Sequence, residues 1–548
     1  MTVSSQRRTG TPRSRRRESD RAEARLRLRA GFVVAALLAG TLVAGGALHA
    51  RPPRSAAVLQ AGQLPVVDLA SSAAVEWQCP GPLPAGASAL HSSVIVANPG
   101  DQPAEVEAQV VAVSAGFANA SSLPSYTTRL SVAPHSQGIV PLRTTGPLQH
   151  DAVSVLSMTG SVAVFESVAA VAAHTHVRRH VPSVPPMAPE QSPCATSPTS
   201  SSYLAAGSTT GRSDVVLSLF NPTATQAVAA VEVSTGSAVV SPPPLQGLII
   251  KPYSLQVFDL ARSVVQQGIL AVTETTSVGR LVLGASETLA ADATANIAIS
   301  GQALLIGVAT PQDTWVMPAG LAQPGRSVSM SVYDPGRRPA TVTISCAVAG
   351  HSLVEITDTV SAGGVREILL PFPAATSSAS KSKAPSLPVD GPIVVRTAQG
   401  VGVVVARVAT RRVSAHAETV ALSVGTANPA DDWLLPASSP PATAQTPGIA
   451  GGIVVSNPSP SGVQVEVLQL TTAGASGPSQ VATVTVAPDS SATVKFRLLA
   501  PAGGPSFAGL EVRASSTVVV EQDFFAVAGT SGPALDVPAP VQGIPVTR

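Results

Sequence analysis

The sequence has 548 residues, of which 45% are hydrophobic and only 3% aromatic, and its formal net charge is +2. That length is too great for one core, so several domains are expected, with cores built from Val, Ala, Leu and Ile. Of the 34 basic and 32 acidic residues, ten arginines and three acids lie in residues 1–30, leaving 24 basic and 29 acidic residues elsewhere. Because the excess of positive charge lies in a terminal tail, the sequence argues against a nucleic-acid-binding protein, whose positive charge should line a folded face.

Residues 31–48 (GFVVAALLAGTLVAGGAL) contain no charged side chain and predict a transmembrane helix. The basic tail of residues 1–30 should stay in the cytoplasm by the positive-inside rule, which makes everything after Leu48 extracytoplasmic. A cleaved signal peptide is the alternative, because residues 44–47 are small; the length of the tail and of the apolar run favours an uncleaved anchor. Residues 49–75, with Pro52 and Pro53, read as a stalk.

Beyond the predicted stalk the chain repeats itself. An apolar strand that ends in Asn-Pro or Asp-Pro occurs four times, at intervals of 123, 113 and 123 residues: Asn98, Asn221, Asp334 and Asn457. The Asn or Asp side chain can bond its own downstream backbone, and the following Pro has a fixed φ and no N–H, so the pair should end a strand and begin a turn. An aromatic residue precedes each marker: Trp77, Tyr203, Trp315 and Trp433. A turn follows it at 134–136, 252–254 and 488–490, replaced by Ala-Gly-Gly at 362–364.

These repeats predict four β modules at residues 76–180, 203–310, 311–428 and 429–535, with a Pro/Ser linker at 181–202 and a C-terminal tail at 536–548. The expected fold is all-β: tandem immunoglobulin-like β-sandwich repeats of six or seven strands each, after one N-terminal transmembrane helix. A four-bladed propeller is the rival, although blades are usually much shorter. If the modules closed into one body, its centre would be the default place for a site. Residues 373–389 read as a surface insertion and a possible contact site.

The three cysteines lie outside the predicted membrane helix. Cys79 opens the first module and Cys194 lies in the linker after it, so a disulfide between them is plausible in an oxidising compartment. Cys346 has the sequence context of a buried strand and is interpreted as a core residue.

Two other groups of residues are possible sites. The cluster of His174, His176 and His180 could contribute two metal ligands, but no nearby acid or cysteine completes a site and two arginines lie beside it, so an exposed strand is favoured. The carboxylates near the closing strands of the modules are interpreted as solvated strand ends: Glu166, Glu287, Glu418 and Glu521. The sequence contains no recognised catalytic motif, and it predicts no catalytic residue, metal site or cofactor.

The basic tail, the single apolar segment, the Trp-x-x-Pro openings at Trp315 and Trp433 and the Asn-Pro strand ends resemble an uncharacterised actinobacterial family of single-pass cell-envelope proteins with repeated β modules. The resemblance implies no activity and transfers no catalytic residue. The expected function is a non-enzymatic, membrane-anchored scaffold or interaction protein of the cell envelope, whose partner is another envelope protein or cell-wall glycan. A glycan-binding accessory protein and an envelope hydrolase are the alternatives.

Overall fold

The structure is a computed structural model, and every residue it describes belongs to one compact unit, residues 60–548. The described residues run from 66 to 547 with gaps at 70–73, 86–89, 115–124, 141, 143–148, 171–189, 206, 212, 291–297, 319, 321–325, 349–352, 371–388, 399, 415–416, 437–448, 472–476, 499–506 and 527–534. They contain 34 strands and two short 3-10 helices, η1 (Pro243–Leu245) and η2 (Leu260–Arg262). The prediction of an all-β protein is confirmed.

The strands are described in four modules along the chain; modules 2 and 3 share one eight-stranded sheet, and the strands of module 4 belong to one nine-stranded sheet. In module 1, one sheet has the order β2 (Glu76–Ala85), β7 (Gln149–Thr159), β4 (Ala104–Ser114), β5 (Tyr126–Val132), and the other the order β6 (Ser136–Val140), β3 (Leu90–Asn98), β8 (Ala163–Ala170), β9 (Glu190–Pro193). Module 3 repeats this arrangement with β19 (Thr314–Met317), β24 (Val389–Thr397), β21 (Ala340–Val348), β22 (Val354–Val360), and with β23 (Val365–Leu369), β20 (Arg326–Tyr333), β25 (Val404–Ser414), β26 (Ala417–Val424).

Modules 2 and 4 vary the same plan. Module 2 pairs β10 (Ser201–Leu204), β16 (Ala271–Val278) and β12 (Ala227–Thr235), and β12 also carries both β13 (Ala238–Val240) and β14 (Leu248–Ile250). Its second sheet is β15 (Ser254–Asp259), β11 (Asp214–Asn221), β17 (Val282–Ala290), β18 (Ala298–Ile306). In module 4 the long strand β32 (Phe507–Ala526) joins both sheets: its first half pairs with β27 (Ala430–Leu435) and β29 (Val463–Thr471), and its second with β28 (Ile449–Asn457) and β33 (Leu535–Gln542). The remaining strands are β30 (Ser479–Val486), β31 (Ser490–Leu498) and β34 (Ile544–Thr547).

A Val-rich core lies between the strands of each module. The core of module 4, for example, joins Val463, Val465 and Val467 of β29 to Ile453 and Val455 of β28. Alternate residues of a strand point to the same face, so these i, i+2 runs of β-branched side chains bury one face of each sheet. The three tryptophans complete the cores of modules 1, 3 and 4, with exposures of 0 to 2%.

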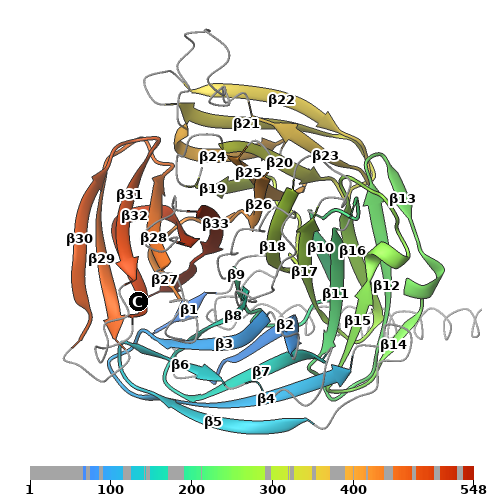
Figure 1. Cartoon of the computed structure of the whole chain (residues 1–548), viewed down its shortest axis with the longest axis horizontal. Coiled ribbons are helices and arrows are strands. Elements are labelled where there is room, and N and C mark those ends of the chain that lie inside the picture. The colour runs from blue at the N-terminus through green and yellow to red at the C-terminus, as the bar shows by residue number, and fades with distance from the viewer. Residues whose placement is uncertain are drawn as a thin grey trace, which may run out of the picture. The chain divides into compact units, whose positions relative to one another are not determined.

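The four modules follow one another in a closed order (Figure 1). Strand β2 of module 1 contacts β17 of module 2, β18 pairs in parallel with β26 of module 3, β26 contacts β33 of module 4, and β33 contacts β9 of module 1. The last and first described strands close the order, because β34 pairs in parallel with β1 (Val67–Asp68). The body is therefore continuous, and its centre is where β9, β18, β26 and β33 meet.

Three segments differ from the prediction made from sequence. The Pro/Ser linker at 181–202 contains β9, which pairs with β8, so these residues complete a sheet of module 1. The tail at 536–548 supplies most of β33 and all of β34, and two residues of the predicted stalk form β1. Such short, polar or Pro-containing segments show no hydrophobic period of their own, because neighbouring modules supply the surfaces that cover them.

The predicted membrane helix at 31–48 and the cytoplasmic tail lie outside the described residues. Within the part of the chain that the structure describes, no helix is long and apolar enough to cross a membrane.

Candidate functional site: a polar junction between modules

The predicted disulfide partners lie side by side. Cys79 of β2 and Cys194, which follows β9, are bonded, with 4.6 Å between their Cα atoms, and both side chains are fully buried. Their backbones approach because Gln78 and Ala195 exchange two hydrogen bonds of 2.6 and 2.8 Å. The bridge therefore joins the innermost strands of the two sheets of module 1. Cys346 is free and buried in the core of module 3, which confirms its interpretation as a core residue.

The interpretation of the closing-strand carboxylates as solvated strand ends is wrong for three of the four. Glu166, Glu287 and Glu521 are 0 to 2% exposed, and only Glu418 keeps partial contact with solvent. Glu166 accepts a hydrogen bond from the backbone N–H of Gly81 in its own module, at 3.0 Å. The strand of Glu287, β17, contacts β2 of module 1, and Glu521 bonds to Arg407 of module 3, contacts that no pattern local to one module reveals. Burial raises the pKa of Glu166 and of Glu287 to about 8, so both should be protonated near neutral pH. The histidine cluster at 174–180 and residues 373–388 of the insertion lie outside the described residues.

Three modules contribute charged side chains to one buried junction. We call Glu190, Arg326, Arg407, Arg411, Glu521 and Asp523 the junction cluster. Its centre is Arg407 of β25, which is 0% exposed: its Nη2 donates to Glu521 Oε1 at 2.6 Å, and its Nη1 donates to the carbonyl oxygen of Pro318. Glu521 belongs to module 4, so the pair ties modules 3 and 4 together.

The other members of the junction cluster share the electrostatic environment of this pair. Burial, reinforced by the positive charge of Arg407, lowers the pKa of Arg326 to about 10, which still leaves it charged at neutral pH. Burial also raises the pKa of Glu521, and Asp523 adds to this rise, whereas Arg407 and Arg326 oppose it. Glu190, from module 1, has its pKa raised well above the usual range by burial and by the negative charge of Asp523. Burial therefore raises the pKa of both Glu190 and Glu521 in the junction.

Further polar groups line the same face of the central sheet. In the ladder between β25 and β26, Ser423 lies opposite Arg407 and Thr419 opposite Arg411, so each pair projects to one side. The Ser423 and Thr419 hydroxyl groups and the Arg407 Nε–H are buried and have no hydrogen-bond partner among the described residues. Buried polar groups are normally hydrogen-bonded, so the junction has capacity for ordered water or another polar ligand.

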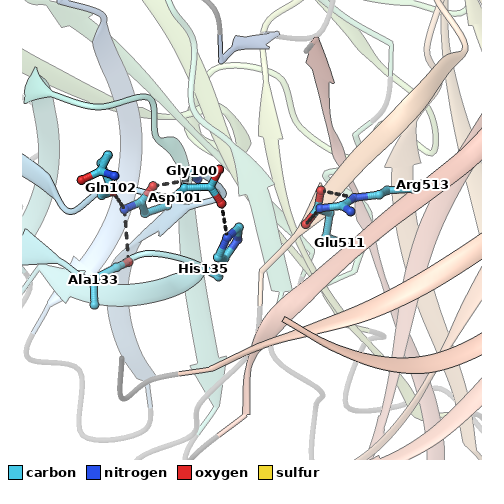
Figure 2. Close-up of polar contacts among 8 residues, drawn as sticks. Gly100, Asp101, Gln102, Ala133, His135, Glu511 and Arg513 are labelled. Carbon is cyan, nitrogen blue, oxygen red and sulfur yellow. Dashed lines mark hydrogen bonds and ion pairs between the residues drawn. The ribbon is translucent and has the colours of Figure 1, made fainter. Parts of the chain in front are cut away.

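A second polar contact region lies where module 4 meets module 1, since β6 contacts β29 and β32. Here His135 Nε2 lies 2.7 Å from Asp101 Oδ1, and Arg513 donates twice, at 2.8 and 3.1 Å, to the fully buried carboxylate of Glu511. Figure 2 shows both pairs. Among the described residues, no group of three or more His, Cys, Asp or Glu side chains is placed to hold a metal ion.

The geometry defines an all-β protein whose modules meet at a buried, charged centre. Compared with known families, residues 191–384 match a family of unknown function, DUF5719. The match starts in β9 and covers module 2 and the first part of module 3. No curated protein matches the chain. The expected resemblance to an uncharacterised family is thus confirmed only as a domain of unknown function; its single-pass and actinobacterial features stay predictions.

Proposed function

We propose that the chain is a non-enzymatic scaffold or interaction protein of the cell envelope, anchored by residues 31–48 and carrying four immunoglobulin-like β sandwiches outside the membrane. The observation that carries the proposal is the buried bridge between Cys79 and Cys194. Disulfides form and persist in oxidising compartments, which is where the basic tail and apolar segment would place the body. The two four-stranded sheets of module 1, which enclose one core, support the sandwich architecture.

The burial of the acids supports a structural role over catalysis. Glu521 is 2% exposed and bonded to Arg407, so in this arrangement it holds two modules together and does not face a substrate. The aromatic residues argue against the glycan-binding alternative, because Trp77, Trp315 and Trp433 are buried in the cores and cannot stack on a sugar. A protein partner in the envelope is therefore the preferred reading.

The compartment is tested by thiol counting on the full chain produced in intact bacterial cells. Because Cys346 is buried, the cells are denatured in the presence of an excess of a membrane-permeant alkylating agent. We expect only Cys346 to be alkylated without reductant, and all three cysteines after reduction. A Cys346→Ser variant should show none before reduction. Alkylation of all three without reductant would contradict an exported body. Protease added to spheroplasts should digest a C-terminal epitope and spare an N-terminal one.

The type of partner is tested by retention of the purified protein on isolated cell wall and by cross-linking in cells. The proposal predicts a cross-linked envelope protein and no retention on purified glycan. Saturable retention on glycan with no cross-linked protein would replace it with the glycan-binding alternative.

A further inference from the structure

The four Asn-Pro or Asp-Pro markers allow an internal comparison. In modules 1, 2 and 4 the marker is Asn, and its Nδ2 donates to the carbonyl oxygen four residues later. It also donates to the carbonyl oxygens of the last residue of β5, β14 or β30 and of the residue that follows it at the start of the turn. For Asn98 these acceptors are Gln102, Val132 and Ala133, at 2.8 to 3.1 Å; Figure 2 labels Gln102 and Ala133. Asn221 and Asn457 make the same three bonds at 2.7 to 3.2 Å.

Each of these Asn side chains also accepts a hydrogen bond from the backbone N–H two residues later, at 2.9 to 3.0 Å. In modules 2 and 4 the same Oδ1 also accepts from the hydroxyl group of Thr223 or Ser459, at 2.8 and 2.7 Å. The amide nitrogen donates to backbone carbonyl oxygens in all three modules. Because the side chains are 0% exposed, the amide fastens the strand end to the turn inside the protein.

Module 3 has Asp334 at this position. Its Oδ1 accepts from the Gly336 N–H at 2.8 Å, as in the other modules, and the side chain is likewise 0% exposed. Its Oδ2 takes the role of the amide nitrogen but has no hydrogen-bond partner among the described residues. An ionised carboxylate has only acceptors, so it cannot bond to backbone carbonyl oxygens, and buried beside them it would be repelled.

The turn of module 3 differs as well. In the other three modules the central turn residue has a positive φ of 46 to 48° (His135, Tyr253 and Asp489). The serine that follows donates to a backbone carbonyl at 2.7 Å. Module 3 has Gly363, with a φ of 67°, and Gly364, which has no hydroxyl group. Its turn therefore lacks one of the side-chain bonds that hold the other turns.

This turn also contacts module 2. The Val365 N–H donates to the carbonyl oxygen of Gly236 at 2.8 Å, and Asp334 N–H donates to the carbonyl oxygen of Gly364 at 2.9 Å. A Cβ on Gly363 would lie 2.9 Å from Val239 of β13. Backbone hydrogen bonds thus connect the marker Asp334 to the turn, and the turn to the hairpin of module 2.

We propose that Asp334 is a proton-dependent latch: protonated, it donates from its carboxyl group to the backbone of the 361–364 turn, and deprotonated, it releases the turn and loosens the contact between modules 2 and 3. The O–H of the protonated Asp334 carboxyl group makes one hydrogen bond, whereas the Asn side chain makes several at this position in the other modules. A cation bound to the Asp334 carboxylate is less favourable than a proton, because the loop from Asp334 to Ala340 carries the positive charges of Arg337 and Arg338.

The surrounding charges agree with this assignment. Burial raises the pKa of Asp334, opposed by the backbone N–H groups of Gly336 and Ala340. The charged or titratable groups on these adjoining elements are Arg326 and Tyr333 on β20, Arg337 and Arg338 on the exposed loop, Glu355 and Asp358 on β22, Arg366 and Glu367 on β23, and Glu232 on β12. Arg366 is bonded to Asp358 at 3.0 Å, so it is already paired with another acid. Because the folded pKa is raised, the stabilisation is complete below the unfolded pKa near 4 and is lost as pH rises through the folded pKa.

The test compares the full chain with two reciprocal variants, Asp334→Asn and Asn457→Asp, by thermal unfolding and by amide hydrogen exchange between pH 4 and 8. Asp334→Asn should raise the unfolding midpoint at pH 7 and increase protection at residues 361–365 and around Gly236, and its advantage over the wild type should shrink toward pH 4. Asn457→Asp should lower the midpoint at pH 7 and recover on acidification, with the loss of protection confined to module 4.

Other buried acids shift the pH dependence of every variant equally, so the differences between variants isolate the latch. A difference between Asp334→Asn and the wild type that stays constant from pH 4 to 8 would overturn the proposal. So would unchanged exchange at Gly236, because the turn would then not be coupled to module 2.

Discussion

Removing Arg407 should weaken the body more than removing any surface charge. Arg407 and Glu521 are 0% and 2% exposed and lie 2.6 Å apart. Breaking a buried pair by deleting one partner typically costs about 3–5 kcal/mol, because the other charge stays buried. Arg407→Met leaves Glu521 beside Asp523, and the pKa of Glu521, already raised by burial, should rise further. Glu521 can then take up a proton, so we expect the lower end of that range, about 3 kcal/mol, near pH 7 and a larger cost at pH 9.

The assay is urea unfolding of the full chain, with Arg407→Met, Glu521→Leu and the double variant measured at pH 7 and pH 9. The double variant should lose less than the sum of the two single variants, since it leaves neither charge unpaired. Arg129→Gln is the matched control: Arg129 pairs with Glu107 at 2.9 Å but is 73% exposed, so its loss should cost less than about 1 kcal/mol. If Arg407→Met is as mild as Arg129→Gln at both pH values, the pair does not hold modules 3 and 4 together.

Three further outcomes are expected. Cys79→Ala/Cys194→Ala should lower the unfolding free energy by about 4–5 kcal/mol, the chain-entropy value for a closed loop of this size, given the sequence separation of 115 residues; wild type measured in reductant should match it. Gly284→Ala should cost about 1–3 kcal/mol in urea unfolding because its Cβ would overlap the backbone of module 1, whereas Gly268→Ala, with 4.0 Å of clearance, should be neutral. The unfolding free energy of Glu166→Gln should equal that of the wild type near pH 4 and exceed it increasingly up to about pH 8, where the difference levels off. The reason is that burial raises the pKa of Glu166 to about 8, so the folded wild type loses stability as pH rises toward that value, whereas Gln does not titrate.

The strand ends of the fold could be predicted from sequence because their chemistry is local. An Asn or Asp before Pro bonds the backbone two residues later, and all four markers do so in the structure. The turn residues at 135, 253, 363 and 489 were located by the same repeat, and each has a positive φ. Two of the tryptophans that precede the markers also make a hydrogen bond within their module. Trp315 Nε1 donates to the carbonyl oxygen of Val403 at 2.8 Å, and Trp433 Nε1 donates to that of Val518 at 3.0 Å.

The junction cluster could not be predicted, because no single module contains it. Arg407 and Glu521 are separated by 114 residues, and each lies on a strand whose own module gives no reason for a buried charge. The strands β9 and β33 were also missed, because β9 lies in the predicted linker and most of β33 in the predicted tail, and both contact other modules at the centre. A repeat of period near 120 residues reveals which segments are equivalent but not which surfaces of different repeats meet.

The polarity of the centre follows from how the modules close. Within each module, β9, β18, β26 or β33 is the last strand of its sheet, and an edge strand normally carries polar or charged side chains because an apolar edge promotes aggregation. Closure then buries these edges against one another, β18 pairing directly with β26. Polar side chains of these edges are then buried, among them Glu190 of β9 and Thr419 and Ser423 of β26. Arg407 of β25 and Glu521 of β32 lie on the strands next to two of these edges, and the bond between their side chains joins modules 3 and 4.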